Sequence, residues 1–171
     1  KRSEFHRHLP LRGQPTMETI ANDFTINIAT ANGTGSQSAN LILLQSMFEM
    51  GIPVSGKNMF PSNISGLPTW YIVRLSDHGY QAPGDRTHIQ ILVNPATWDE
   101  DLASLESGSV VIWNSDAKRE MNRDDVISYP VPMSSLARKI NPKIAKLVTN
   151  IVYVGILAEM LGIEQAALVS A

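Results

Sequence analysis

The sequence predicts an α/β domain, a three-layer sandwich in which helices cover both faces of a mostly parallel sheet. Three observations favour this Rossmann-like class. Short runs rich in β-branched and aromatic residues alternate with longer runs in which apolar residues recur every three or four positions. Hydrophobic residues make up 43% and charged residues 18% of the 171 positions, which suits a chain that buries a core. A glycine-containing turn joins the first expected strand to the first expected helix.

The first half of the chain gives the clearest elements. Residues 24–31 alternate and are rich in β-branched side chains, so we expect a strand there. Apolar residues then repeat at helical spacing over 36–50, and Gly51 stands where a helix often ends. A second strand is expected to begin at 52–54. The following residues, 55–68, read as an irregular loop, and a loop of this length in a compact domain usually has a function.

The second half continues the alternation. Further strands are expected at 69–76, 87–94, 109–115 and 126–131. Further helices are expected at 97–105, 134–139 and 143–161, with the opening of one more in the last ten residues. For the first of these helices, Thr97 is the expected N-cap and Glu100 its capping-box partner. The strand at 109–115 is almost continuously apolar, so we expect it to be covered on both faces.

Composition excludes several classes. The net charge of −2 argues against a nucleic-acid partner. The chain has no cysteine, so it holds no disulfide, iron–sulfur cluster or zinc–thiolate site, and we expect a cytoplasmic protein. The four histidines show no metal-ligand spacing, so no metal site is expected. No apolar run reaches the ~18 residues of a membrane span, since Asn150 and Glu159 interrupt the most apolar segment.

The ends of the chain suggest its domain limits. Residues 1–16 are polar and basic and lack the apolar core of a secretory signal, whereas Met17 opens a sequence that reads as a natural start. We expect residues 1–16 to be a tail, vector-derived or an upstream extension, and residues 17–171 to form one domain. The abrupt end at Ala171 suggests a fragment of a longer subunit.

The glycine turn does not complete a nucleotide fingerprint. The three places that a dinucleotide motif fills with glycine hold Gly33, Gly35 and Ser38, and no carboxylate closes the second strand to bind a ribose. A phosphate-binding P-loop is excluded because no Gly-Lys-Ser/Thr follows. What remains is a tight turn at a helix N-terminus, which suits an anion or a carboxylate of a partner.

The loop at 55–68 is the second candidate. It combines glycine and proline with polar donors and with apolar side chains, so it is either a packed Ω-loop or a contact surface. In an open α/β sheet this loop and the glycine turn would project from the carboxyl ends of adjacent strands. The candidate ligand- or partner-contacting residues are Gly33, Thr34, Gly35, Ser36, Gln37, Lys57, Asn58, Pro61, Ser62, Asn63 and Gly66. No catalytic residue is assigned.

These two loops carry a family resemblance. The stretch "GTGSQSANLILLQSMFEMGIPVSGKNMFPSNISGLPTWYIVRLS" resembles the gamma domain of 2-oxoacid:ferredoxin (acceptor) oxidoreductases, in the form that begins the alpha subunit of 2-oxoglutarate-type enzymes. The segment "TNIVYVGILAEMLGIE" resembles the last helix of that domain. The resemblance covers about residues 22–164.

The resemblance implies more than the residues themselves do. Enzymes of this family decarboxylate a 2-oxoacid on thiamine diphosphate with Mg, pass electrons through iron–sulfur clusters to ferredoxin or another acceptor, and form an acyl-coenzyme A. The implied partners are a thiamine-pyrimidine-binding alpha domain and a diphosphate-binding beta subunit, within an oligomer. The gamma domain is implicated in coenzyme A access, so alone this chain is expected to turn nothing over.

The sequence also departs from the family pattern. The commoner turn is Gly-x-Gly-Gly-Gln-Gly, and here Gly33, Gly35 and Gln37 match while Ser36 and Ser38 take the later glycine places. The following loop commonly reads Pro-Ser-Glu-x-Arg-Gly-Gly. Here its acidic residue, its arginine and its last glycine are replaced by Asn63, Ser65 and Leu67. The departures predict a divergent subgroup.

Two other interpretations stay open. The chain could be a self-contained oxidoreductase that binds a nicotinamide or a flavin at the turn of residues 33–35. It could also be an oligomerisation or scaffold module that associates through residues 59–70. Copurifying cofactor would favour the first, and self-association without a small-molecule ligand would favour the second.

Overall fold

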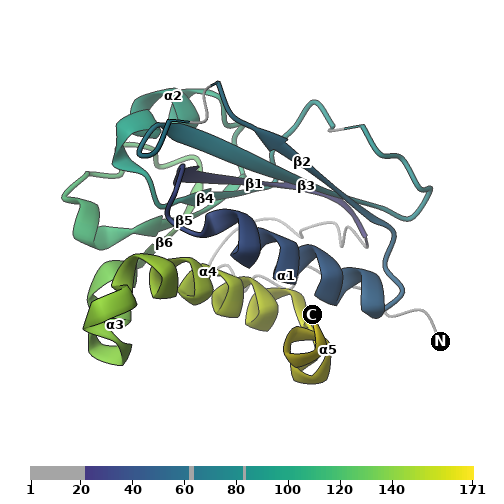
Figure 1. Cartoon of the computed structure of the whole chain (residues 1–171). Helices are drawn as coiled ribbons and strands as arrows, with labels where there is room; N and C mark the ends of the chain where they lie inside the picture. The colour runs from purple at the N-terminus through teal and green to yellow at the C-terminus, as the bar shows by residue number, and fades with distance from the viewer. Residues whose placement is uncertain (1–21, 62–63, 83) are drawn as a thin grey trace.

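The computed structural model describes residues 22–61, 64–82 and 84–171, which form one mixed sheet with helices on both faces (Figure 1). The strands are β1 (Asp23–Ala31), β2 (Val54–Met59), β3 (Pro68–Ser76), β4 (Ile89–Leu92), β5 (Val110–Asn114) and β6 (Ile127–Val131). The helices are α1 (Ser36–Glu49), α2 (Trp98–Ala103), α3 (Met133–Ile140), α4 (Ala145–Leu161) and α5 (Gln165–Ser170). Short 3₁₀ turns lie at Pro95–Thr97, Ser115–Ala117 and Pro142–Ile144.

The sheet has the strand order β2-β3-β1-β4-β5-β6. Strands β1, β4, β5 and β6 pair in parallel, whereas β3 is antiparallel to both of its neighbours, β1 and β2. Strand β2 therefore runs in the same direction as β1, and β3 is the one reversed strand of this sheet. The predicted α/β class with a mostly parallel sheet is confirmed.

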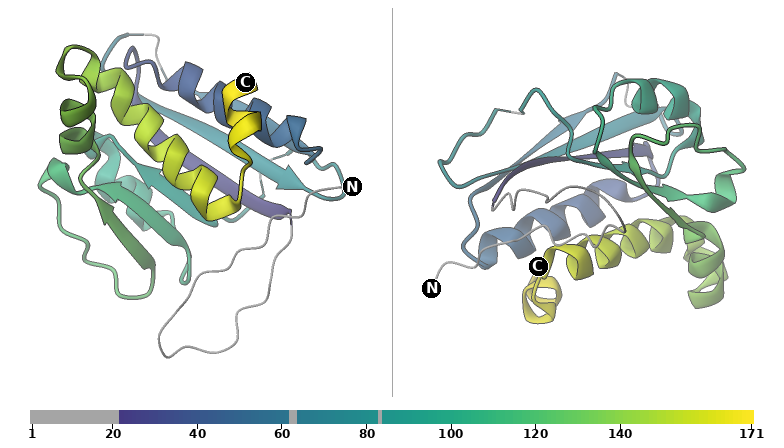
Figure 2. Two further views of the ribbon diagram at one scale, coloured as in Figure 1. Left: turned by 90° about the horizontal axis from the view of Figure 1, so that it is seen from below. Right: turned by 180° about the vertical axis from the view of Figure 1, so that it is seen from behind.

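Helices α1 and α4 lie side by side on one face of the sheet and cover the main core, while α2 lies on the other face (Figures 1 and 2). Alternate residues of β1 and β3 point into the main core, among them Ile26 and its neighbour Val73, both fully buried. Leu43 of α1 and Leu157 of α4 close the core from below. The three-layer arrangement follows from this burial on two faces.

The face under α2 holds a smaller core. Trp98 and Leu102 of α2 pack on Leu92 and Val111, and the ring of Trp98 meets Trp113 edge-on at 5.3 Å between centroids. Strand β5 is buried along nearly all its length, as its apolar run predicted. Because α2 has just six residues, it covers the β4–β5 side of the sheet and leaves β2 exposed on its outer side.

The expected loop at 55–68 is wrong in its first part. Residues Val54–Met59 form the edge strand β2, which makes a hairpin with β3. A polar run can form this strand because one of its edges and one of its faces meet solvent. Gly56 is required there, since a Cβ at this position would lie 2.2 Å from the hydroxyl of Tyr71 on β3. The hairpin connection is limited to residues 60–67.

The expected capping box of the helix after β4 is also wrong. Thr97 makes no side-chain cap, and its hydroxyl donates instead to Oδ2 of Asp101 at 2.6 Å. The 3₁₀ turn led by Pro95 begins the helical segment earlier than expected, and Asn94 caps that turn by accepting from the backbone N–H of Ala96 at 3.0 Å. The other expected elements are confirmed, and their ends lie within three residues of the expected ones.

Helix α4 is the most apolar of the three longer helices. Together with the preceding 3₁₀ turn, Pro142–Leu161 is long and apolar enough to cross a membrane by length and composition alone. Core helices pass the same criterion, and the side of α4 that carries Thr149, Tyr153 and Leu157 is buried against the sheet. We therefore describe α4 as a core helix with one outward-facing side.

Candidate functional site

A pocket of about 320 Å³ opens where β1, β4 and β5 end. It is lined by Ala31, Asn32, Gly33, Thr34, Ser65, Gly66, Val93, Asn94, Pro95, Asn114, Ser134, Lys146, Thr149 and Asn150. These residues come from the turn after β1, the β2–β3 hairpin, the ends of β4 and β5, the first turn of α3 and the first two turns of α4.

The topology explains why the pocket lies here. From β1 the chain passes through α1 to β2 on one side, and from β4 it passes through α2 to β5 on the other. The two connections leave the carboxyl ends of the adjacent parallel strands β1 and β4 in opposite directions. Such a switch point leaves a crevice, and ligands of open α/β sheets bind in that crevice.

The turn after β1 and the β2–β3 hairpin form one wall. The backbone N–H of Asn32 donates to the carbonyl of Leu67, and that of Gly66 donates to the carbonyl of Asn32, each at 2.8 Å. Gly33 has φ +79°, and a Cβ there would lie 2.5 Å from the hydroxyl of Ser65. The glycine therefore permits both the left-handed backbone and the close approach of the hairpin.

Helix α4 closes the opposite side of the turn. Gly35 begins α1 with φ +82°, and a Cβ there would lie 2.6 Å from Cδ1 of Leu147. Asn150 is buried and donates its side-chain amide to the carbonyl of Thr34 at 2.8 Å. The turn is thus fixed by packing on two sides, and the glycine pattern follows from neighbouring protein rather than from a nucleotide.

Two asparagines form the base of the pocket. Asn94, at the end of β4, donates to the carbonyl of Thr30 at 3.2 Å and so ties β4 to β1. Asn114, at the end of β5, donates to the hydroxyl of Ser134 at 2.8 Å and so ties β5 to α3. Their amides hold β1, β4, β5 and α3 at fixed positions around the pocket, which favours a preformed site.

A carboxylate stabilises the first turn of α3 beside the pocket. Asp116 accepts from the backbone N–H and from the hydroxyl of Ser135, each at 2.7 Å. Burial alone would raise the pKa of Asp116, but these hydrogen bonds and the positive charge of Arg138 outweigh it and keep the pKa below its ordinary value. Asp116 is therefore ionised at neutral pH and acts as the N-terminal anion of α3.

The pocket offers binding groups rather than catalytic ones. Among its described lining residues Lys146 is the one charged side chain, and the others contribute amides, hydroxyls, backbone and short apolar groups. That set includes no carboxylate, histidine or other general base, and within the described chain no three His, Asp or Glu side chains gather as metal ligands. The arrangement suits a polar or anionic ligand held by hydrogen bonds and one cation.

The residues predicted from the sequence are brought together in part. Gly33, Thr34 and Gly66 line the pocket, whereas Gly35 supports it from behind through Leu147. In the first turn of α1, Ser36 is buried and Gln37 is exposed, and neither lines the pocket.

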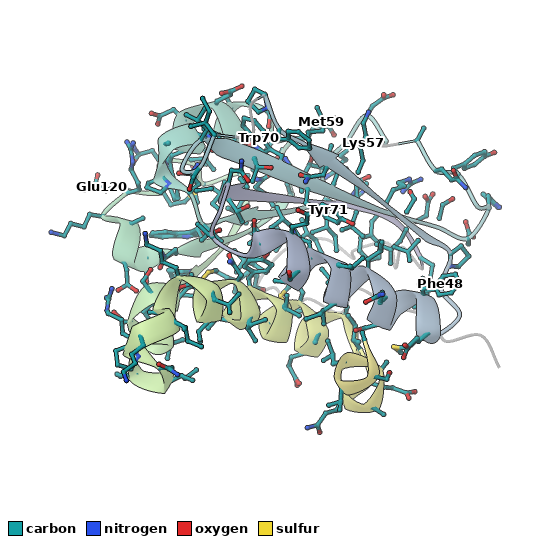
Figure 3. All side chains as sticks on the ribbon, in the orientation of Figure 1. Phe48, Lys57, Met59, Trp70, Tyr71 and Glu120 are labelled. Atoms are coloured by element: carbon teal, nitrogen blue, oxygen red, sulfur yellow. The ribbon has the colours of Figure 1, made fainter. Side chains whose placement is uncertain are left out.

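The candidates on β2 lie elsewhere. Lys57 pairs with Ile72 and is drawn with Met59 and Trp70 on the side of the sheet away from α1 (Figure 3). Asn58 accepts a hydrogen bond from the hydroxyl of Thr69 at 3.1 Å. Pro61 is exposed in the hairpin connection. Ser62 and Asn63 lie outside the described residues, so their predicted contacts stay predictions.

Sequence reasoning named three of the fourteen described lining residues of the pocket, Gly33, Thr34 and Gly66. The missed polar residues are Asn32, Ser65, Asn94, Asn114, Ser134, Lys146, Thr149 and Asn150. A signal existed for two of them, since Asn94 and Asn114 stand at the carboxyl ends of expected parallel strands, where α/β ligands bind. No comparable pattern marked Lys146, Thr149 and Asn150 inside an apolar helix.

The sheet order also bears on a dinucleotide. In a dinucleotide-binding fold the strand that carries the ribose-binding acid lies next to the first strand and runs parallel to it. Here β3 takes that place and runs antiparallel to β1. The carboxyl end of β3 therefore lies beside the amino end of β1, away from the pocket. The hairpin connection between β2 and β3 stands where the ribose would be recognised.

Fold and pocket together define the chain as a Rossmann-like α/β domain with a pocket at the switch point. The family model for pyruvate ferredoxin/flavodoxin oxidoreductase matches residues 25–171. The chain therefore belongs to the pyruvate ferredoxin/flavodoxin oxidoreductase family, which confirms the resemblance seen in the sequence. No curated protein sequence matches it significantly.

Solved structures share the fold. The 2-oxoglutarate:ferredoxin oxidoreductase from Magnetococcus marinus, solved with 2-oxoglutarate, coenzyme A and succinyl-CoA bound, superposes with a TM-score of 0.77 at 23% identity. That match covers 86% of this chain and 26% of the relative, so the chain spans about a quarter of the relative's length.

Two further relatives are shorter chains. The gamma subunit of a keto/oxoacid ferredoxin oxidoreductase from Geobacter sulfurreducens gives a TM-score of 0.68 at 18% identity, over 85% of this chain and 82% of its own. The pyruvate oxidoreductase subunit PORC from Thermotoga maritima gives 0.66 at 17% identity, over 86% of this chain and 82% of its own. At these identities the likeness establishes the α/β fold.

Proposed function

We propose that this chain is the gamma component of a cytoplasmic 2-oxoacid oxidoreductase complex that forms an acyl-coenzyme A, and that the switch-point pocket binds part of coenzyme A. The pocket carries this proposal because it pairs one cation with several amides and hydroxyls and lacks catalytic groups among its described residues. Family membership and the fold shared with a coenzyme A-bound relative support it.

The chemistry of the lining suits that ligand. Coenzyme A joins phosphates to a pantetheine arm that carries two amides. Lys146 can pair with a phosphate, while backbone groups of the Gly33 turn and side chains such as Thr149 can hydrogen-bond to an amide. A pocket of about 320 Å³ holds part of so long a ligand, so a partner surface completes the site.

The remaining chemistry belongs to other parts of the complex. The chain has no cysteine, so clusters held by cysteine are bound by another chain or domain. Thiamine diphosphate with Mg is assigned to the alpha domain and beta subunit that the family resemblance implies, and ferredoxin or another acceptor takes the electrons. In this arrangement the described residues bind and orient the acyl acceptor and make no bond to the 2-oxoacid.

Isothermal titration of coenzyme A tests the proposal. We expect heat of binding for the complex assembled from this full chain and its thiamine-binding partner subunits, and weaker heat or none for the chain alone. Omission of the chain from an otherwise assembled complex should lower the affinity for coenzyme A. An active complex that binds coenzyme A equally well with and without the chain would refute the assignment.

A further inference from the structure

The outer side of α3 and α4 carries exposed apolar side chains at helical spacing. Ile144, Leu147 and Ile151 follow one another at intervals of three and four, and each is 40–47% exposed. On α3, Leu136 and Ile140 have the same spacing and are 37% and 69% exposed. Exposed apolar side chains that share one side of a helix mark a contact surface more often than apolar side chains scattered singly over a protein.

We call the exposed side chains of Leu136, Ile140, Ile144, Leu147 and Ile151 the outer helical face.

Basic residues border the outer helical face. Between Asp125 and Glu159 the sequence contains no acidic residue, yet it contains Arg138, Lys139, Lys143 and Lys146. All four are exposed and lie on α3, on the 3₁₀ turn after it and on the first turn of α4. The chain has 14 lysines and arginines in total, so the rest of it holds 10 basic residues against 16 acidic ones. The charge is therefore segregated, with the positive part around the apolar stripe.

Gly155 is a second, independent indication that another protein packs on this surface. It lies inside the 17-residue helix α4, is exposed, and has nothing within 4 Å of the place where a Cβ would be. A glycine inside a helix is less stable than an alanine, and here no contact within the described chain compensates for that loss. A backbone or side chain of another protein that packs directly on α4 would account for the glycine.

We propose that the outer helical face, with Gly155, is the docking surface for an acidic, partly apolar surface of the thiamine-binding partner subunit. Apolar anchors framed by polar residues are the usual anatomy of a specific interface, and the basic border selects carboxylates on the partner. This inference rests on the proposed function, which supplies the partner, and it adds which surface of the chain is used.

A second copy of the chain fits less well. A symmetric dimer through this surface would bring the same four cations of each copy together, and like charges oppose such a contact. A head-to-tail contact with the acidic remainder of another copy would leave an open chain of copies. The relative from Magnetococcus marinus carries the matched fold within a chain about four times as long, which is consistent with a large neighbouring partner.

The test measures binding of the full chain to the purified thiamine-binding subunits of its own complex. Ile151→Glu should weaken binding at least about tenfold, while Tyr80→Glu, a matched change at an exposed apolar residue on the loop after β3, should leave it unchanged. Lys139→Glu with Lys143→Glu should weaken binding and reduce its dependence on salt.

The glycine gives the sharpest comparison. Gly155→Ala and Gly155→Leu should each raise the melting temperature of the chain by about 2–4 °C, because both residues favour a helix more than glycine does. Gly155→Leu should nevertheless weaken partner binding about tenfold or more, and Gly155→Ala should do so less. A stabilised Leu variant that binds as well as the wild type would overturn the proposal.

Other occupants give distinct results. Sedimentation of the wild type as a dimer that Ile151→Glu dissociates, with partner binding unaffected, would assign the face to a second copy and overturn the proposal. The wild type could instead bind vesicles of phosphatidylcholine with phosphatidylserine, and Ile151→Glu could abolish that binding while partner binding stays intact. This result would assign the outer helical face to a membrane surface and would also overturn the proposal. If the wild type itself does not bind the partner subunits, the proposed function fails together with this inference; if wild type and variants bind equally, this inference alone fails.

Discussion

The side-chain amide of Asn150 donates to the backbone carbonyl of Thr34, 2.8 Å away and 116 residues earlier in the sequence. One hydrogen bond therefore joins the second turn of α4 to the turn that follows β1. Through it, the helix that carries Lys146 and Thr149 is fixed relative to the glycine turn, and these two segments form adjacent walls of the pocket.

We predict that Asn150→Ala lowers the free energy of unfolding by about 1–3 kcal/mol. The Asn150 side chain is 1% exposed, and its removal leaves the partly buried Thr34 carbonyl without this donor. Urea unfolding followed by circular dichroism measures the change. An unfolding curve identical to that of the wild type would show that the bond does not hold the turn. Where the folded fraction is matched, coenzyme A affinity of the assembled complex should also fall.

Lys146→Ala should separate binding from stability. Lys146 is exposed at the pocket, so its loss should change the free energy of unfolding by less than about 0.5 kcal/mol. Loss of a charge-assisted contact to a phosphate should weaken coenzyme A binding by the complex about tenfold or more.

The matched control for that variant is Lys118→Ala, at an exposed lysine that does not line the pocket. It should leave coenzyme A affinity unchanged. Equal affinities for the Lys146 variant, the control and the wild type would exclude Lys146 from the ligand site.

The order of elements was predictable because each carries a local signal. The alternation in β1, the helical repeat of α1 and the apolar run of β5 each follow from which faces the core covers. Local patterns do not say which strands become neighbours. Strand β3 lies antiparallel between β1 and β2 because it forms a hairpin with β2. The sequence did not predict this hairpin, since the polar residues of β2 are typical of a loop.

The candidate site was predictable where it lies on loops and not where it lies on a helix. The glycine turn carries a backbone signal, although its glycines serve contacts with Ser65 and Leu147 that no local pattern reveals. Asn150 occurs in an apolar helix, and its role depends on a contact across 116 positions. A polar residue on the buried side of an apolar helix is informative only once its partner is known.

Tyr153→Phe should test how firmly α1 and α4 are joined in the core. The Tyr153 hydroxyl, fully buried, donates to Oδ1 of Asn40 at 2.7 Å, and Asn40 is 2% exposed. Burial raises the pKa of Tyr153 well above its ordinary value, so the hydroxyl remains a donor at neutral pH. We predict a loss of about 1–2 kcal/mol, because the Asn40 oxygen is left unpaired.

A double variant distinguishes the hydrogen bond from packing. Asn40→Leu together with Tyr153→Phe should recover part of the loss, since both polar partners are then replaced by apolar groups. Tyr80→Phe, at a residue 65% exposed, serves as the control and should change nothing. Strictly additive effects of the two core substitutions in chemical denaturation would argue against a direct coupling of the two side chains.

Asp101 should give the fold a pH dependence of a defined sign. It lies on α2 and is 4% exposed, and it accepts from Nε1 of Trp70 on β3 at 2.7 Å and from the hydroxyl of Thr97 at 2.6 Å. Burial raises its pKa above the ordinary value of 3.8, more than these two hydrogen bonds lower it, and the charge of Glu100 adds to the rise.

A carboxyl whose pKa is raised on folding stabilises the fold below its unfolded pKa, and this contribution is lost as the pH rises through the folded pKa. In Asp101→Asn the amide oxygen can still accept from Trp70 while the NH₂ group donates to Thr97, and position 101 no longer titrates.

Asp116 and Asp125, whose pKa values are lowered, act in the opposite direction, but their contributions cancel when the variant is compared with the wild type. The unfolding free energy of the wild type minus that of the variant should therefore fall between about pH 3 and the folded pKa of Asp101, and stay constant above it. Urea titrations at a series of pH values measure this difference, and a difference that rises with pH would show that the carboxylate is stabilised by its two donors more than burial disfavours it.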